Sequence, residues 1–354
     1  MKVFAVNSSA RTGDVSKTEI ILDNLVKGMR EEGADVEVIN LRKKKIRYCI
    51  GCFTCWTKTP GKCLHKDDMT AELFPKYQDC DLCVLATPLF HYTVNAQMKT
   101  FIERTLPIAL PFFELRNGVT RHPARHEPPP VVLISVAGFP EDSVFDQISS
   151  YANYLFGDRL VAEIYRTSSE MISETSTKKA ITDIFEATVQ GGRELVNNRN
   201  ISDETMARMT AQITDFEQMA PIGNLMWKTC IDEGVTLGEF QKKNMVPRPD
   251  SIETFITIMK IGFNPANADN MKTVIQFNFS GQVKGACYLA VENSSLIAEI
   301  GPAKNPDLTI DTPFELWMDI LTGKADGQQM FMDQKYTASG NLELLIKFGE
   351  FFGG

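Results

Sequence analysis

The sequence lacks features that would place it in a membrane, secreted or nucleic-acid-binding class. Its 354 residues contain no apolar run near the roughly 18 residues that a spanning helix needs. The amino-terminal apolar stretch is too short for a secretory signal peptide. Positive charge is scarce, because 37 Lys and Arg stand against 45 Asp and Glu, for a net charge of −8. Nucleic acid and anionic membranes favour a basic face, so we expect neither as the main partner.

Histidine is also rare, with four residues, and no obvious acid–base pair stands out in the sequence. Cysteine is better represented, with eight residues. Without a secretory signal, these cysteines indicate a reducing compartment, where clustered thiols serve metal or redox chemistry rather than disulfides. We therefore expect a cytoplasmic protein.

The first part of the chain, residues 1 to about 200, alternates short apolar segments with helical patterns. The predicted strands are residues 2–6, 36–41, 81–86, 130–137 and 160–165. Strands separated by helices predict parallel β-α-β crossovers, and hence an α/β fold with a doubly wound five-stranded sheet. Ligands of such sheets bind beyond the carboxyl ends of the strands, so the loops at Asn7, Thr87 and Ala137 should converge.

The rest of the chain changes character twice. Residues 201–249 are polar, Met-rich and helical in pattern, and they end at Pro247 and Pro249, so we interpret them as a helical linker. Residues 250–354 are predicted to form an α+β domain with a mostly antiparallel sheet. Its expected strands are 274–280, 285–291, 296–300 and 308–310. A helix capped by Thr312 and stopping at Gly323, and a last helix over 342–352, complete it.

Four cysteines lie close together in the first part, at Cys49, Cys52, Cys55 and Cys63. Successive two-residue gaps bring sulfurs near one another, as in iron–sulfur ligation. Two other interpretations stay open: reduced thiols in a turn, or a zinc site. The basic residues 42–47, just upstream, are either a solvated loop or a patch that offsets a cluster's charge or attracts an acidic electron donor or a nicotinamide phosphate.

The loop after the first strand, residues 7–18, supplies hydroxyl groups, one guanidinium and the start of a helix, a combination that suits a phosphate monoester. It is neither a dinucleotide-binding G-x-G-x-x-G loop nor a Walker loop, and its Ser and Thr residues could instead be simple helix caps. The candidate phosphate ligands are Ser8, Ser9, Arg11, Ser16 and Thr18.

The loop after the third strand is aromatic and contains a proline, which suits the flat slot that an isoalloxazine ring needs. Its residues are Pro88, Leu89, Phe90, His91 and Tyr92. Ordinary loop packing is the alternative. Gly138, after the fourth strand, would allow a ligand to approach the backbone closely.

These motifs resemble the flavodoxin-like NAD(P)H-dependent FMN reductases, specifically their iron–sulfur flavoprotein branch. The similarity rests on residues 8–11, the cysteine run leading into 66–69, residues 87–92, and residues 98–104. It implies that the phosphate-loop residues hold FMN, that residues 88–92 flank its ring, and that the four cysteines ligate a 4Fe–4S cluster. It further implies NAD(P)H or a ferredoxin-like protein as electron donor, and a homodimer or homotetramer.

Residues from about 250 to 354 resemble the sterol-carrier-protein family, through residues 277–281, 305–310, 314–323, 327–332 and 339–341. The resemblance implies an apolar tunnel that carries a sterol or an acyl chain. The last predicted helix is apolar on most faces, which fits either such a tunnel or a dry core or docking surface. Candidate lining residues are Met318, Met330, Phe331, Met332, Ile346 and Phe348.

Two functions therefore follow from the sequence. The first is an FMN-dependent oxidoreductase that passes electrons from NAD(P)H or an electron-transfer protein to a small acceptor. Because the lipid-binding domain would present an apolar molecule to the flavin, this acceptor would be apolar. The second is a lipid carrier or scaffold whose flavodoxin-like half is not catalytic.

Overall fold

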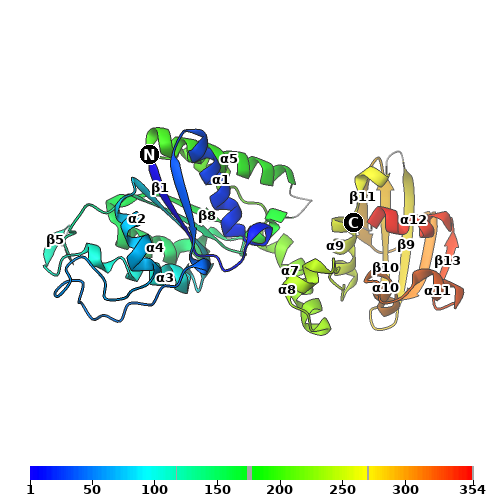
Figure 1. The fold of residues 1–354 in the computed structure, drawn as a ribbon. Coiled ribbons are helices and arrows are strands. Elements are labelled where there is room, and N and C mark those ends of the chain that lie inside the picture. Colours follow the sequence, from blue (N-terminus) through cyan, green and yellow to red (C-terminus); the bar gives the residue numbers. More distant parts are fainter. Residues whose placement is uncertain (117, 174–177, 269–270, 353–354) are drawn as a thin grey trace. The chain divides into compact units, whose positions relative to one another are not determined.

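The computed structural model describes residues 1–116, 118–173, 178–268 and 271–352, and the chain divides into two units, Met1–Phe216 and Glu217–Gly354 (Figure 1). Residues 201–249, the expected linker, are divided between them, and the predicted domain limits at 200 and 249 stay a prediction. Among the described residues, no helix combines the length and the apolar character needed to cross a membrane.

A parallel sheet forms the centre of the amino-terminal unit. Its strands are β1 (Lys2–Asn7), β2 (Asp35–Asn40), β3 (Leu82–Phe90), β7 (Val131–Val136) and β8 (Leu160–Arg166). They lie in the order β2-β1-β3-β7-β8, all parallel, which is the flavodoxin-like order. The predicted fold class is thus confirmed. The sequence did not predict β4 (Thr93–Val94), which pairs antiparallel with β3, or the separate hairpin of β5 (Glu114–Arg116) and β6 (Val119–Arg121).

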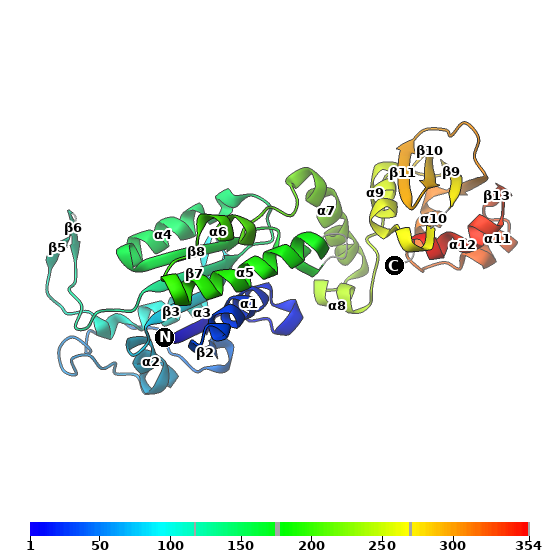
Figure 2. The same cartoon turned by 90° about the horizontal axis from the view of Figure 1, so that it is seen from above.

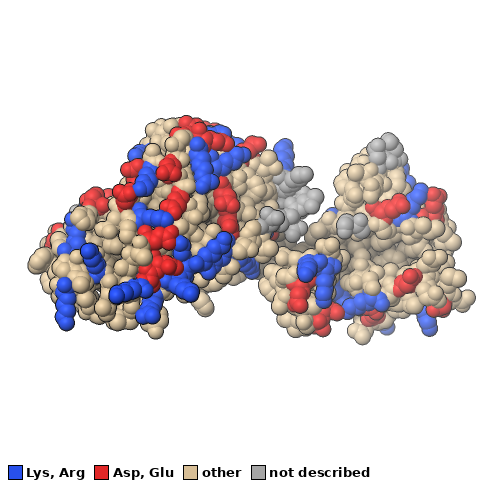
Figure 3. Space-filling view, in the orientation of Figure 1, with Lys and Arg blue, Asp and Glu red and all other residues tan. Residues whose placement is uncertain are grey.

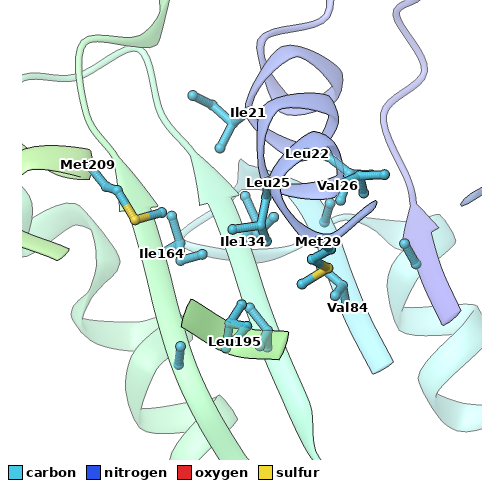
Figure 4. Close-up of a cluster of buried hydrophobic side chains, with 14 of the residues drawn as sticks. Ile21, Leu22, Leu25, Val26, Met29, Val84, Ile134, Ile164, Leu195 and Met209 are labelled. Carbon is cyan, nitrogen blue, oxygen red and sulfur yellow. The ribbon is translucent and has the colours of Figure 1, made fainter. Parts of the chain in front are cut away.

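Helices cover both faces of this sheet. They are α1 (Lys17–Glu31), α2 (Phe74–Gln78), α3 (Ala96–Glu103), α4 (Asp146–Phe156), α5 (Lys178–Asn198) and α6 (Asp203–Met209). On one face α1, α5 and α6 enclose a core with β3, β7 and β8, in which Leu25, Ile134 and Leu195 are completely buried (Figure 4). On the other face α2, α3 and α4 enclose a second core. Buried on both faces, the central strands are nearly all apolar, as a parallel sheet requires.

Two glycines let α1 and α5 cross closely, and the two helices lie side by side in Figure 2. A Cβ added at Gly28 would lie 1.8 Å from the Val189 carbonyl oxygen, and one at Gly192 would lie 2.1 Å from that of Leu25. These neighbours are backbone atoms, so a side chain can be accommodated only if one helix moves.

The carboxy-terminal unit has helices and a sheet of its own. Its helices are α7 (Phe216–Glu233), α8 (Leu237–Lys242), α9 (Ile252–Gly262), α10 (Phe314–Leu321), α11 (Gly327–Met332) and α12 (Glu343–Phe352). Its strands are β9 (Lys272–Ser280), β10 (Gly285–Glu292), β11 (Ser295–Ile300), β12 (Leu308–Pro313) and β13 (Thr337–Gly340). The strand order is β11-β10-β9-β12-β13, antiparallel except for the β9–β12 pair, so the mostly antiparallel sheet is confirmed.

One expected helix cap in this unit is wrong. Thr312 does not cap α10, because it belongs to β12, where it lies opposite Phe279 of β9, and its hydroxyl donates to the Pro313 carbonyl. Pairing with β9 extends the strand by three residues beyond the expected 308–310, and the helix starts at Phe314. The expected stop at Gly323 agrees with the structure, since α10 ends at Leu321 and Gly323 has a φ of 71°.

We predict that Gly28→Ala destabilises the protein by about 1–3 kcal/mol, because the added methyl group forces α1 away from α5. Calorimetric unfolding of the full chain would measure the loss. Gly223→Ala in α7 is the control, since a Cβ there meets nothing within 4 Å, and helix propensity alone should make it neutral or stabilising. Equal effects of the two substitutions would contradict the close-crossing explanation.

Candidate functional site

The loop after β1 is fixed by a network of backbone and amide contacts. The Asn7 side chain accepts from the Ser9 N–H at 2.9 Å and donates to the Asn40 side chain, at the end of β2, at 2.8 Å. The Ser8 N–H and hydroxyl both donate to the Ala86 carbonyl of β3, at 2.9 and 3.2 Å. The loop is thereby attached to both strands that flank β1.

Some of the predicted phosphate ligands stabilise the loop itself, and others could still bind a ligand. Ser16 caps α1 by accepting the Glu19 N–H at 3.2 Å, and its hydroxyl donates to Ser9 Oγ at 2.8 Å. Ser9 Oγ also accepts the Arg11 N–H at 3.2 Å, so among the described contacts its own proton is given to no acceptor. Thr18 is buried in the first turn of α1. The cap interpretation thus holds for Ser16, and an anion at this helix start would meet the positive end of its dipole.

Arg11 is the exposed cation of the loop. Its guanidinium donates to Glu170 Oε1 at 3.0 Å, and the two side chains are 53% and 45% exposed. Glu170 lies in the turn after β8, and a Cβ built at Gly138, after β7, would lie 3.9 Å from its Cγ. The loops after β1, β7 and β8 therefore meet at the carboxyl edge of the sheet, as expected for the first two. Glu170 is not among the residues predicted from the sequence, and it is separated from Arg11 by 159 positions.

Two of the five basic residues in the run 42–47 are neutralised by nearby carboxylates. Arg42 donates to the Ser9 carbonyl at 3.3 Å and to both Glu19 carboxylate oxygens at 3.2 Å. These contacts anchor residues 7–18, here called the phosphate loop because they are predicted to hold a phosphate. Lys44 pairs with Glu72. On the face shown in Figure 3, acidic and basic side chains of the amino-terminal unit are interspersed. Arg42 is thus a structural part of the site rather than a solvated charge.

The predicted aromatic loop is a strained hairpin. β3 continues to Phe90, where Phe90 pairs with Thr93 of β4, so the loop is shorter than expected and Pro88 and Leu89 lie in the strand. The turn consists of His91 and Tyr92, with φ of 49° and 62°. Non-glycine residues in this region cost about 1–3 kcal/mol each and cluster at functional sites. Phe90 and Tyr92 are 57% and 53% exposed, so the hairpin presents aromatic surface.

Asn95 connects this hairpin to the phosphate loop. Its side-chain amide donates to the Ser8 carbonyl at 2.7 Å, its N–H donates to Thr87 Oγ1 at 3.2 Å, and its Oδ1 caps α3 by accepting from Met98 at 3.0 Å. Asn95 is not among the residues predicted from the sequence, although an Asn directly before a helical pattern is a recognisable cap signal.

The four clustered cysteines line one cavity, together with residues that include His65 and Arg104. Cys55 is buried, Cys49 and Cys63 are half-buried, and Cys52 is exposed. Burial raises the pKa of the Cys55 thiol, and the neighbouring thiols of Cys63, Cys49 and Cys52 raise it further. The other three thiols therefore lie near enough to Cys55 to disfavour the ionised form of its thiol.

A buried ion pair anchors the cysteine loop. Arg104, directly after α3, binds both carboxylate oxygens of Asp67 at 2.7 and 3.0 Å, and the side chains are only 1% and 5% exposed. Arg104 also donates to the Arg47 carbonyl at 2.6 Å and to Thr70 Oγ1 at 3.0 Å. Burial would lower the pKa of Arg104, but Asp67 and the Cys63 thiol raise it above its ordinary value.

The donor set of this cavity fits an iron–sulfur cluster. Among the described residues, no group of three or more His, Cys, Asp or Glu side chains is arranged to hold a metal ion. A cluster differs from a single ion because its own iron and sulfide fill the space between the ligand sulfurs. Nε of Arg104 and Nε2 of His65 are buried without a hydrogen-bond partner in the described chain, as expected where sulfur acceptors would be added.

The candidate lipid-lining residues lie in or around a core rich in aromatic rings. Met318 and Phe348 are buried, and Met330 and Phe331 pack at its margin. At its centre the Phe277 ring lies 5.0–5.8 Å from the rings of Phe255, Phe279, Trp317 and Phe348. Ile346 and Met332 are 83% and 70% exposed. Their role in lipid binding stays a prediction.

Two protein families match separate parts of the chain. Residues 1–138 match the NADPH-dependent FMN reductase family. Residues 264–353 match the SCP-2 sterol transfer family. Both resemblances inferred from the motifs are thereby confirmed.

Similar curated proteins are iron-sulfur flavoproteins. One from Archaeoglobus fulgidus is 42% identical over 108 residues, which are 30% of this chain and 46% of the relative. One from Methanocaldococcus jannaschii is 34% identical over 119 residues, 34% of this chain and 58% of the relative. The chain thus spans about half the length of these curated relatives.

Solved structures align with just over half of the chain. An FMN-dependent NADH-azoreductase of Bacillus anthracis in complex with FMN has a TM-score of 0.43 and 13% identity, covering 55% of this chain and 99% of that one. An NAD(P)H:quinone oxidoreductase of Methanothermobacter marburgensis has a TM-score of 0.41 and 15% identity, covering 55% and 96%.

We predict that Asp67→Asn destabilises the protein by about 3–5 kcal/mol, because it leaves the Arg104 cation buried and unpaired. Urea unfolding at pH 7 would measure the loss. Asp68→Asn is the matched control and should cost much less, since among the described residues the Asp68 carboxylate accepts one hydrogen bond, from the Lys45 N–H. A loss no greater than the control's would show that the pair does not anchor the loop.

The same pair predicts a pH dependence. Burial would raise the pKa of Asp67, but hydrogen bonds from Arg104, Arg47 and Thr70 lower it from 3.8 to about 2. A carboxyl whose folded pKa is depressed stabilises the fold above its unfolded pKa. We therefore expect about 2 kcal/mol of stability, present above pH 4, to be lost as the pH falls towards 2. Urea unfolding of wild type and Asp67→Asn across this range should show an acid-dependent loss that is larger in wild type by about this amount, because the other carboxyl groups titrate in both proteins.

Proposed function

We propose that the amino-terminal unit binds FMN and passes electrons from NAD(P)H, or from a ferredoxin-like protein, to a small acceptor. The observation that carries this proposal is the convergence of four loops at the carboxyl edge of the sheet. There an exposed guanidinium, a helix start and a strained aromatic hairpin stand together. The match to the NADPH-dependent FMN reductase family supports it.

The residues have distinct parts in this proposal. Arg11, the Ser9 hydroxyl and the start of α1 would hold the phosphate, while Ser8, Ser16 and Thr18 keep the loop in place. The hairpin at Pro88–Tyr92 and the open backbone at Gly138 would border the ring. When bound, FMN accepts a hydride and releases electrons singly or in pairs. The chain itself then needs no acid–base pair, and its task is to orient the cofactor and shield it from water.

We further propose that Cys49, Cys52, Cys55 and Cys63 ligate a 4Fe–4S cluster that carries single electrons. The four-thiol cavity and the two buried nitrogen atoms without a partner, Nε2 of His65 and Nε of Arg104, support this assignment. The curated relatives that share this part of the chain are named iron-sulfur flavoproteins, which is consistent with it.

The match of residues 264–353 to the SCP-2 sterol transfer family favours a second activity. We propose that this unit binds an apolar molecule, which would make a quinone or a steroid a suitable acceptor. A carrier with an inactive amino-terminal unit is the competing function.

Anaerobic purification followed by a visible spectrum and by iron and sulfide assays tests these functions. We expect flavin absorption together with iron and sulfide in roughly equal amounts, and bleaching on addition of NAD(P)H. A colourless protein that copurifies with lipid and does not bind added FMN would support the carrier instead.

The Arg11–Glu170 pair gives a sharper prediction for FMN. Arg11→Ala should weaken FMN binding about 10- to 100-fold, because it removes charge-assisted hydrogen bonds to phosphate. Glu170→Gln should strengthen it about two- to fivefold, because an exposed ion pair worth up to about 1 kcal/mol no longer competes for Arg11. Calorimetric titration of the apoprotein with FMN would measure both.

Riboflavin, which lacks the phosphate, should bind all variants equally. Arg199→Ala serves as the control substitution, since Arg199 contacts the Asp81 carbonyl at the opposite edge of the sheet. Equal losses for FMN and riboflavin in Arg11→Ala would rule out a phosphate contact.

A further inference from the structure

Two nitrogen atoms in the wall of the cysteine cavity have no hydrogen-bond partner among the described residues. They are Nε2 of His65 and Nε of Arg104, and both atoms are buried. A buried N–H without an acceptor carries the full cost of its desolvation, so such groups are rare in folded chains. The other polar side chains of the cavity are the four thiols and Glu103, and the Glu103 carboxylate pairs with Lys99 at 3.3 Å. The four thiols therefore point to sulfur as the missing acceptor.

Arg104 contributes a local hydrogen bond rather than a net charge. Its two terminal nitrogens are used by Asp67, by the Arg47 carbonyl and by Thr70, and Asp67 neutralises the guanidinium at 2.7 Å. Because the guanidinium is planar and rigid, these hydrogen bonds also fix the orientation of its remaining N–H, at Nε. The Asp67 carboxylate cancels most of the long-range electrostatic field of the guanidinium charge. The Nε–H dipole is therefore the part of Arg104 that would interact with a nearby sulfur atom.

We propose that His65 and Arg104 are positioning residues that donate N–H···S hydrogen bonds to the cysteine-bound cluster and raise its reduction potential. This inference rests on the proposed cluster. One-electron reduction adds one negative charge to the cluster and its sulfurs and breaks no bond, with the electron supplied by the reduced flavin or by a chemical reductant. Hydrogen-bond donors stabilise the added charge, and so favour the reduced form.

The test is a potentiometric titration of anaerobically purified full-length protein, followed by electron paramagnetic resonance. His65→Phe keeps a planar ring but removes the N–H, and His65→Gln restores a side-chain N–H at a similar reach. His126→Phe is the matched control, because His126 is exposed and does not line the cavity. Arg104→Lys keeps the cation beside Asp67 and removes the fixed Nε–H.

We expect His65→Phe and Arg104→Lys each to make reduction about tenfold less favourable, which for a one-electron couple is about 59 mV towards negative potential. His65→Gln should lie close to wild type, and His126→Phe should be unchanged. If His65→Phe does not load iron, the Arg104→Lys titration decides the question.

The possible contrary results are distinguishable. Unchanged potentials in both His65→Phe and Arg104→Lys, with iron and sulfide intact, would overturn this inference and leave the proposed cluster standing. Wild-type protein that contains zinc, or neither iron nor sulfide after reconstitution, would overturn the cluster and this inference together, while the FMN titrations would still test the flavin assignment independently.

Discussion

The bidentate ion pair between Arg104 and Asp67 fixes the position of the cysteine loop relative to the sheet. The stretch from Lys44 to Asp67 contains no strand and no α-helix, so it has few regular hydrogen bonds of its own. Asp67 lies at its end, the Arg47 carbonyl near its beginning, and Arg104 joins both to the end of α3. A buried pair of this kind adds little stability compared with apolar packing, but each partner accepts only one geometry. It therefore serves to position the loop.

The phosphate loop shows a different use of polar residues. A run of serines and a threonine suggests that many hydroxyl groups point at an anion. The hydroxyl groups of Ser8 and Ser16 instead form hydrogen bonds with backbone groups of the chain. Asn7, Arg42 and Asn95, from outside or at the margin of the motif, complete that support. The groups left for a ligand are few and well placed, which lowers the reorganisation that binding requires.

The amino-terminal sheet could be predicted from the sequence because its parallel strands are short apolar runs with helical patterns between them. Local chemistry also identified the Ser16 cap and the thiols that line one cavity. The failures are contacts between distant positions. Thr312 has every local feature of a cap, but pairing with β9 keeps it in a strand. No local pattern could indicate that β3 continues through Pro88, or that Glu170 reaches Arg11 across 159 positions.

Helix α3 joins the two parts of the candidate site. Its cap, Asn95, holds the phosphate loop against the hairpin, and the residue that follows it, Arg104, holds the cysteine loop. Eight residues of α-helix span about 12 Å, so the anchors of the two sites are held roughly that far apart. Met98 and Phe101 are fully buried beneath the sheet, so the helix cannot slide without opening the core. The distance between the proposed flavin and cluster sites is therefore set by apolar packing, while their chemistry is set by the polar groups at the two ends of one helix.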